Sequence, residues 1–320
     1  MATHRPRVIT LLTDFGVQDA YAGAMKGVIA GINPFANIID ICHTVPPQDI
    51  FSGAYLLYTA YKYFPRKTIH VAVVDPGVGS KRDIVCVETE NFFFLAPDNG
   101  LLSFIIQDER PKSVHRVTND KYFLPSLSST FHGRDVFAPV AAHLSLGVKP
   151  QQLGIEINRL EQLEIPSPTY KNGRIEGQVI SVDRFGNLIS NITRLHIEQR
   201  LKCQIQDPGR GAGVRSKKQE VGSMKQEGRG KRQEVGGEKQ EALKKASKER
   251  VFFRYDAMET TIGKKRIVGL SNTYTDVKPG EPLVLLGSSG FLEVSVNRGN
   301  AQKYFEADRN SKIRVEMGSY

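Results

Sequence analysis

The chain has 320 residues, 40% hydrophobic and 24% charged, with a formal net charge of +10. This composition is ordinary for a globular protein, and the length allows two domains. No apolar run approaches the roughly 20 residues that a membrane-spanning helix needs, so we expect no membrane partner. The short apolar run near the N-terminus is interrupted at Asp14, too early for a signal peptide.

The cysteines and histidines argue against disulfides and metal sites. Cys42, Cys86 and Cys203 are widely spaced and form no CxxC pair, which indicates a reducing compartment, the cytoplasm by default. The seven histidines show no HxxxH or HExxH spacing, so we expect no metal ion.

The first half of the chain alternates strand and helix signals. The predicted strands are residues 7–15, 37–43, 68–75, 83–89 and 91–96, and the predicted helices are residues 19–32, 49–64 and 133–147. This alternation predicts an α/β sandwich domain over residues 1–165, with a mainly parallel sheet covered by helices on both faces. In such folds ligands bind beyond the carboxyl ends of the strands.

The second half has a different pattern. Residues 164–174, EIPSPTYKNGR, are punctuated by Pro and Gly and predict a linker. Short strand patterns without helices follow, and they predict a smaller antiparallel β-barrel, or a sandwich, over residues 172–320. The predicted strands are residues 176–183, 187–192, 250–255, 265–271, 282–287 and 291–296.

A basic low-complexity segment, about residues 209–250, interrupts this second domain. It holds 13 Lys and Arg against 6 Asp and Glu, a net of +7, and it contains the near-repeat KQEVGSMKQ and RQEVGGEKQ. Its few sizeable apolar residues cannot offset the entropy of ordering, so we expect a solvated insertion. Contact with RNA or a membrane through its charge is the alternative.

Two familiar motifs are excluded by their context. DFG at Asp14 matches the magnesium motif of kinases, but only one strand precedes it, which leaves no room for the glycine-rich and catalytic loops. GVGSK at Gly77 lacks the ending and spacing of a phosphate-binding loop.

Polar residues gather where predicted strands end or helices begin. VAVVDPGVGSKRD ends a strand in Asp75 and returns through Pro and Gly to Arg82, and STFHGRD places His132 just before a helix. Asp14 ends the first strand, and Asp19 opens the next helix. Such aspartates are commonly turn or cap residues, although one could hold the hydroxyls of a ribose and the other an ammonium group.

Two turns in the second half also carry polar groups. DRFGN, starting at Asp183, reads as a hairpin turn with polar and aromatic content. The Ser-Ser-Gly turn at Ser288 offers N–H groups and hydroxyls suited to a carboxylate, although such turns are common.

Taken together, six segments resemble, in order, the S-adenosylmethionine (SAM) hydroxide adenosyltransferases, which are SAM hydrolases related to fluorinating and chlorinating enzymes. The segments are VITLLTDFGVQDAYAGAMKG, VVDPGVGS, APDNGLLS, TFHGRDVFAP, DRFGNLISNI and GSSGFLEVSVNRGNA. They span nearly the whole chain outside residues 209–250. The resemblance implies an α/β N-terminal domain, a β-barrel C-terminal domain, and a homotrimer with active sites at subunit interfaces.

The resemblance also implies roles for individual residues. Asp75, Arg82 and His132 match the three residues that hold the attacking water or hydroxide. The matching substrate-binding residues are Asp14 for the ribose diol, Asp19 near the methionine amine, Asp183 and Asn187 for the amine and the adenine, Phe185 against the base, Ser288 and Ser289 for the methionine carboxylate, and Asn297 and Arg298 at the adenine edge. The fluorinating relatives have an Arg after the first Ser, where this chain has Ser289.

The implied reaction is hydrolysis of SAM to adenosine and L-methionine, with water or hydroxide attacking the 5′ carbon of the ribose and no cofactor. One alternative is a SAM-dependent halogenase of the same fold. A carboxylate facing a halide would repel it, so Asp75 favours water. The other alternative is a regulatory module that binds SAM or adenosine, whose basic insertion contacts RNA; apart from that, we expect no nucleic-acid partner.

Overall fold

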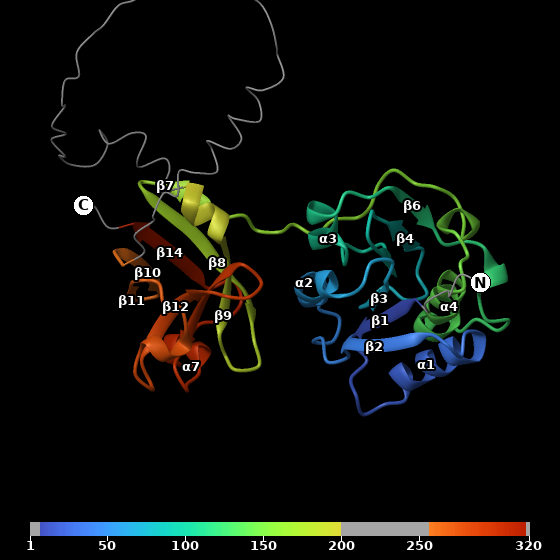
Figure 1. The fold of residues 1–320 in the computed structure, drawn as a ribbon, viewed down its shortest axis with the longest axis horizontal. Helices are drawn as coiled ribbons and strands as arrows, with labels where there is room; N and C mark the ends of the chain where they lie inside the picture. The colour runs from blue at the N-terminus through green and yellow to red at the C-terminus, as the bar shows by residue number, and fades with distance from the viewer. Residues whose placement is uncertain (1–6, 200–255, 318–320) are drawn as a thin grey trace, which may run out of the picture. The chain divides into compact units, whose positions relative to one another are not determined.

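The computed structural model describes residues 7–199 and 256–317. The chain divides into two compact units, residues 1–165 and 166–320, and each has its own sheet (Figure 1). The predicted insertion of residues 209–250 and the predicted strand of residues 250–255 lie outside the described residues.

In the described part of the first unit, six strands form one sheet with the order β2-β1-β3-β5-β4-β6. β1, β2, β3 and β5 run parallel, while β4 runs antiparallel to both of its neighbours, β5 and β6. The strands are β1 (Val8–Thr13), β2 (Asn37–Cys42), β3 (Ile69–Val73), β4 (Ile84–Glu88), β5 (Phe93–Pro97) and β6 (Ser113–Arg116). The prediction of a mainly parallel sheet is confirmed, and β6 is a strand that the sequence pattern did not reveal.

Helices cover both faces of this sheet. The helices and helical turns are α1 (Tyr21–Ile32), α2 (Ile50–Ala60), α3 (Ser103–Asp108), α4 (Ala138–Ser145), the π-helical turn η3 (Gly133–Phe137), and the 3-10 turns η1 (Tyr61–Tyr63), η2 (Asp120–Tyr122) and η4 (Pro150–Gln152). α1 packs against α4 on one face, and α2 packs against α3 on the other (Figure 1).

The alternation of side chains along β1 and β3 explains why both faces are covered. Ile9, Leu11 and Val73 point into the core that α1 and α4 complete. Val74 points the other way, against α2 at Gly53, where an added Cβ would lie 2.9 Å from the Val74 side chain. Because successive residues of a strand alternate between faces, a strand covered on both sides is apolar throughout.

The described part of the second unit forms an eight-stranded antiparallel sheet with the order β11-β10-β14-β8-β9-β13-β12, in which β7 also pairs with β8. A bridge between Ser271 and Leu285 brings the segment after β11 against β12, so the sheet curls into a nearly closed barrel. The predicted barrel is confirmed. Its strands are β7 (Thr169–Lys171), β8 (Arg174–Val182), β9 (Leu188–Thr193), β10 (Met258–Ile262), β11 (Lys265–Val268), β12 (Pro282–Leu286), β13 (Phe291–Val296) and β14 (Lys312–Met317).

Short helical segments lie between these strands. They are the 3-10 turn η6 (Tyr274–Asp276), the helix α7 (Ala301–Phe305), and residues 194–199 directly after β9. The predicted linker of residues 164–174 is only partly a linker, because β7 lies within it and pairs with β8.

Candidate active site

Three predicted residues meet at the carboxyl edge of the first sheet. The guanidinium of Arg82 donates from Nε to Oδ1 of Asp75 at 2.7 Å and from Nη2 to Oδ2 of the same carboxylate. Nη2 also lies 3.2 Å from Nδ1 of His132. The side chains of Asp75 and Arg82 are only 5% and 11% exposed. The fold therefore brings the imidazole of His132 to a carboxylate and a guanidinium that come from one loop earlier in the chain.

The loop after β3 is shaped so that Arg82 returns to Asp75. Hydrogen bonds from Val78 N to Asp75 O and from Ser80 N to Gly77 O form consecutive turns. An added Cβ at Gly77 would lie 3.4 Å from Cγ of Arg82 and 3.8 Å from Oδ1 of Asp75, so the loop closes directly over the ion pair. The turns formed by this Pro- and Gly-rich segment thus place Arg82 next to Asp75.

The end of β5 braces the same loop. Asn99 donates from Nδ2 to the carbonyl of Val74 at 2.9 Å, and Asp98 N donates to the carbonyl of Asp83 at 2.9 Å. The residue before Asp75 and the residue after Arg82 are therefore both tied to the APDNG segment. In the sequence this segment was recognised only through the family resemblance, and no role was predicted for Asn99.

His132 is held by a second loop. The buried carboxylate of Asp135 accepts hydrogen bonds from Arg134 Nε at 2.6 Å and from Ser128 N at 2.6 Å, which anchors both sides of the loop that carries His132. Burial raises the pKa of Asp135, but these hydrogen bonds outweigh burial and hold the pKa below its ordinary value.

The imidazole of His132 is neutral near pH 7. Partial burial and the charge of Arg82 lower the pKa of His132 below its ordinary value, and the carboxylates of Asp75 and Asp135 oppose this shift only in part. Because a guanidinium can only donate, Nδ1 of His132 accepts from Arg82, and the proton of the neutral ring lies on Nε2.

Asp14 lies at the same edge as the triad. Thr13 pairs with Val73 in the parallel register of β1 and β3, so Asp14 and Asp75 follow neighbouring strand ends. Oδ2 of Asp14 accepts from Gln48 N at 2.8 Å, and no donor within residues 7–199 and 256–317 reaches Oδ1. One carboxylate oxygen is therefore available to a ligand.

Asp19 is exposed and precedes α1, which begins at Tyr21 rather than at Asp19. The ring of Tyr21 lies 5.0 Å from that of Phe131, the residue before His132, and both rings contact Phe15. Asp19 is therefore within two residues of an aromatic cluster that joins the Asp14 loop to the His132 loop.

The remaining predicted residues lie in the second unit. Asp183 organises the β8–β9 turn: Oδ1 accepts from the backbone N–H groups of Phe185 and Asn187, each at 2.9 Å, and Oδ2 accepts from Asn187 Nδ2 at 2.8 Å. The predicted hairpin turn is thus present, and Asp183 holds it together. Phe185 is 75% exposed, which leaves its ring free to stack.

The loop after β13 lies beside that turn. Gln302 N donates to the carbonyl of Gly186 at 2.8 Å, and Nδ2 of Asn297 donates to the carbonyl of Val277 at 2.7 Å. Arg298 is exposed and has a left-handed backbone, with φ of 51°. The adenine-edge residues predicted from the resemblance therefore converge at one end of the barrel.

Ser288 and Ser289 lie in the β12–β13 turn, at the other end of β13. Gly290 N donates to Gly287 O at 2.9 Å and closes the turn, and Arg194 N donates to Gly290 O at 3.2 Å. No Arg follows Ser288 in the sequence. The structure places Arg194 from the end of β9 beside this turn, a juxtaposition that no local pattern predicts.

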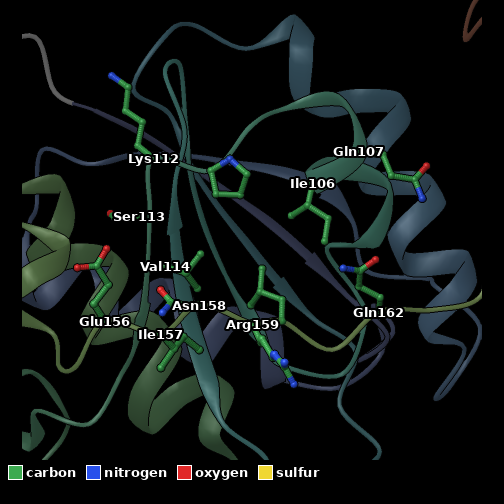
Figure 2. A pocket seen from close by; sticks show the side chains of 12 residues that line it. Ile106, Gln107, Lys112, Ser113, Val114, Glu156, Ile157, Asn158, Arg159 and Gln162 are labelled. Carbon is green, nitrogen blue, oxygen red and sulfur yellow. The ribbon is translucent and has the colours of Figure 1, made fainter.

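A separate cavity of about 410 Å³ lies in the first unit, with apolar and polar side chains such as Val114 and Arg159 in its lining (Figure 2). One wall is Ser113, which pairs with Glu88 at the end of β4 that is remote from Arg82. The cavity is therefore distinct from the triad.

The described residues hold neither a metal cluster nor a membrane span. Within residues 7–199 and 256–317, no group of three His, Cys, Asp or Glu side chains is placed to share a metal ion. No helix in that same part of the chain is long and apolar enough to cross a bilayer.

Comparison with known proteins identifies the family. The SAM hydroxide adenosyltransferase N-terminal domain matches residues 9–154, and the C-terminal domain of that family matches residues 241–314. The chain is 31% identical to the (R)-S-adenosyl-L-methionine hydrolase of Thermus thermophilus, over 97% of this chain and 99% of that protein. The chain belongs to the SAM hydroxide adenosyltransferase family.

Other relatives agree. The (R)-S-adenosyl-L-methionine hydrolase of Methanocaldococcus jannaschii is 41% identical over 58% of this chain and 67% of its own length. A fluorinase from Actinoplanes is more distant, at 25% identity over 60% of this chain and 74% of its own. A crystal structure of an uncharacterised conserved protein from Thermotoga maritima superposes with a TM-score of 0.76 at 30% identity, covering 96% of this chain and 99% of that one.

Proposed function

We propose that this chain hydrolyses SAM to adenosine and L-methionine. Family membership defines the reaction class, and the observation that carries the proposal is the hydrogen-bonded set of Asp75, Arg82 and His132 beside Asp14. The relatives' names specify the (R) configuration at sulfur, so we expect the (R) sulfonium epimer to be the better substrate.

The chemistry needs an activated water but no acid for the leaving group. The oxygen of water forms a bond to the 5′ carbon as the bond from that carbon to sulfur breaks, and the electron pair of the broken bond stays on sulfur. Methionine leaves as a neutral thioether, and one proton is released in each turnover. Because hydroxide and sulfonium neutralise each other, a site that excludes bulk water favours the transition state.

Arg82 is the group that lowers the pKa of the attacking water. Its permanent charge favours hydroxide, and each unit of pKa depression corresponds to about 1.4 kcal/mol. Asp75 fixes the orientation of the guanidinium through two hydrogen bonds. His132, with its proton on Nε2, can donate a hydrogen bond to the nucleophile and aim it in line with the breaking bond.

Substrate binding is proposed to draw on both units. Asp14 has one oxygen available for the ribose diol, and Asp19 would lie near the methionine amine. Asp183 and Asn187 would contact the methionine amine and the adenine. Phe185 would lie against the base, and Asn297 and Arg298 would lie at the adenine edge. Ser288 and Ser289 would receive the carboxylate. A homotrimer with sites at subunit interfaces would bring the two sets together, and molar-mass measurement in solution tests this assembly.

We also propose that the enzyme is cytoplasmic. It needs no cofactor in this scheme, since the sulfonium itself provides the leaving group. Asp75 at the nucleophile position disfavours halide, because two negative charges would repel. We expect no nucleic-acid partner. Binding of RNA measured at several salt concentrations, with the full chain and with a chain lacking residues 209–250, tests whether the basic insertion contacts nucleic acid.

The test is incubation of the full chain with each sulfonium epimer of SAM, in chloride-free buffer and then with added halide, followed by chromatography. Adenosine and methionine in equal amounts, independent of halide and with one proton released per turnover, are the expected products. A 5′-halo-adenosine would instead establish a halogenase, and intact SAM with measurable binding would establish a regulatory module.

A further inference from the structure

A buried histidine near Asp14 has no place in the scheme above. His43 directly follows β2, the strand beside β1 in the first sheet, and is only 7% exposed (Figure 1). Its Nδ1 lies 2.8 Å from the hydroxyl of Thr13, the last residue of β1. Thr13 is fully buried and immediately precedes Asp14. A contact between two neighbouring strand ends therefore leads straight to the carboxylate proposed to hold the ribose.

The other ring nitrogen of His43 faces Asp40. Nε2 lies 3.0 Å from Oδ1 of Asp40, an electrostatic contact that is not aligned as a hydrogen bond. Lys26 donates to Oδ2 of the same carboxylate at 2.5 Å. Burial raises the pKa of Asp40, but Lys26 and His43 outweigh burial and hold the pKa below its ordinary value. Because the ionised carboxylate can only accept, it favours a proton on Nε2, and Nδ1 then accepts from Thr13.

A register shift between β1 and β2 makes this arrangement possible. Leu11 pairs with Asp40 but Leu12 pairs with Cys42, so β2 contains one extra residue at this point. Residues three apart in a regular strand point to opposite faces, and one extra residue brings them to the same side. Asp40 and His43 can therefore face each other, which strict alternation would not predict.

His43 holds the backbone on both sides of Asp14. The Thr13 hydroxyl that contacts His43 also accepts from Phe15 N at 3.2 Å, which closes a tight turn around Asp14. The carbonyl of His43 accepts from Gly16 N at 2.7 Å. The turn that presents Asp14 is thus tied to His43 through the imidazole before the aspartate and through the backbone after it.

The far end of the loop between β2 and α2 holds the Asp14 carboxylate itself. Gln48 N donates to Oδ2 of Asp14 at 2.8 Å, and Gln48 has a left-handed backbone, with φ of 66°. A residue other than glycine adopts this conformation at a cost, and such strain gathers at functional sites. The loop therefore fixes one oxygen of Asp14 and leaves Oδ1 for a ligand.

We propose that His43 is a positioning residue for Asp14, and that the loop between β2 and α2 sets the selectivity of the site for the ribose diol. The inference rests on the proposed function, since it takes Asp14 as the group that holds the diol. A diol presents two donors at a fixed separation, so its hydrogen bonds depend steeply on the orientation of the carboxylate. A shift of the Asp14 turn should weaken binding of the diol and leave contacts to the adenine intact.

The test compares adenosine with 2′,3′-dideoxyadenosine, which lacks both hydroxyls of the diol, by calorimetry on the full chain. Wild-type protein should bind adenosine at least about tenfold more tightly, the factor typical of a hydrogen bond to a charged group. His43→Leu should reduce this preference to about threefold or less, by weakening adenosine while dideoxyadenosine binds as before.

Polar variants identify the contact that matters. His43→Asn places an amide near the position of Nδ1, within reach of Thr13, so it should retain most of the preference. His43→Gln places its amide near the position of Nε2, toward Asp40, and should lose the preference as His43→Leu does. Thr13→Ser keeps the hydroxyl and Thr13→Val removes it at nearly the same shape, so the preference should survive in Thr13→Ser alone.

His70→Leu is the matched control. His70 is buried on β3, and its Nδ1 lies 2.8 Å from the hydroxyl of Thr10 on β1, the same kind of contact three residues before Thr13. The variant removes a buried pair of histidine and threonine from the same sheet without touching the Asp14 turn. It should lower the melting temperature and keep the preference for adenosine.

The outcomes separate the inference from the function beneath it. The inference is overturned if His43→Leu or Thr13→Val keeps the preference, if either weakens both nucleosides alike, or if His43→Asn loses the preference as fully as His43→Leu. Wild-type protein that prefers adenosine but leaves SAM intact would overturn the hydrolase proposal alone. Equal binding of the two nucleosides by wild-type protein would overturn the role of Asp14 and this inference together.

Discussion

Nη2 of Arg82 lies 3.2 Å from Nδ1 of His132, and this contact determines what the imidazole can do. The lone pair of the neutral ring faces a group that can only donate, so it is not available to remove a proton from water. In the proposed mechanism the triad therefore holds the nucleophile through charge and orientation, and His132 acts as a hydrogen-bond donor rather than as a general base.

Replacement of Arg82 tests the electrostatic role. Arg82→Ala should lower kcat by at least about 100-fold, the loss expected if the pKa of the attacking water rises by about two units, while SAM binding is largely retained. Arg82→Lys keeps the charge but cannot make the two-pronged contact with Asp75, so we expect intermediate activity. Steady-state kinetics with binding by calorimetry measure both effects. Full activity of Arg82→Ala would refute the assignment.

The pH dependence of kcat/KM follows from His132. Because its pKa is lowered below 6.5, the ring stays neutral and keeps its contact with Arg82 as the pH falls from 7.5 to 6.5. Protonation at lower pH places an N–H against the guanidinium, and activity should fall there. An acid limb with a midpoint at or above 6.5 would contradict this, and His132→Gln should lose that limb together with most of the activity.

Gly79 should be indispensable for the loop that returns Arg82. Its φ is +76°, and an added Cβ would lie 2.4 Å from the carbonyl oxygen of Ser129, in the loop before His132. Gly79→Ala should therefore push the two loops apart and reduce kcat by about tenfold or more, since small displacements of catalytic groups are costly.

The matched control for Gly79 is Gly147, which has φ of +102° with no atom within 4 Å of an added Cβ. Gly147→Ala carries similar backbone strain without a collision, so it should reduce thermal stability slightly and leave kcat unchanged. Equal losses of activity in the two variants would show that strain, and not the contact with Ser129, is responsible.

His70 should make stability sensitive to mild acid. It is fully buried on β3, accepts or donates one hydrogen bond with Thr10 at 2.8 Å, and stacks on Phe94, and burial lowers its pKa to about 3. Between pH 6.5 and 3 the unfolded chain binds a proton there that the folded chain does not, so the free energy of unfolding falls as pH falls, by up to about 1.4 kcal/mol per unit.

His70→Leu removes this titration. The variant should lose about 1 kcal/mol at pH 7.5 with the Thr10 hydrogen bond, yet its melting temperature should fall less than that of the wild type between pH 7 and 5. Parallel melting curves over this range would show that another group controls the acid sensitivity.

The local sequence pattern was enough to predict the fold class and the order of the two domains. Apolar runs such as VAVV before Asp75, and helical spacing such as that over residues 19–32, predicted an α/β unit followed by a β-barrel, because burial on one or both faces imposes a period that a single sequence displays. The strand-end rule drew attention to Asp14 and Asp75, since strand ends in such a sheet share one edge, whereas Arg82 and His132 were assigned with Asp75 from the family resemblance.

Only the tertiary structure decided how these residues interact. That Arg82 also faces His132, that Asn99 ties β5 to the end of β3, and that Arg194 adjoins the Ser288–Ser289 turn all depend on contacts between segments distant in the chain. The spacing of apolar residues along a helix or strand specifies which of its faces is buried. The partner of a polar side chain, by contrast, is set by strand order and register, which depend on packing across the whole unit.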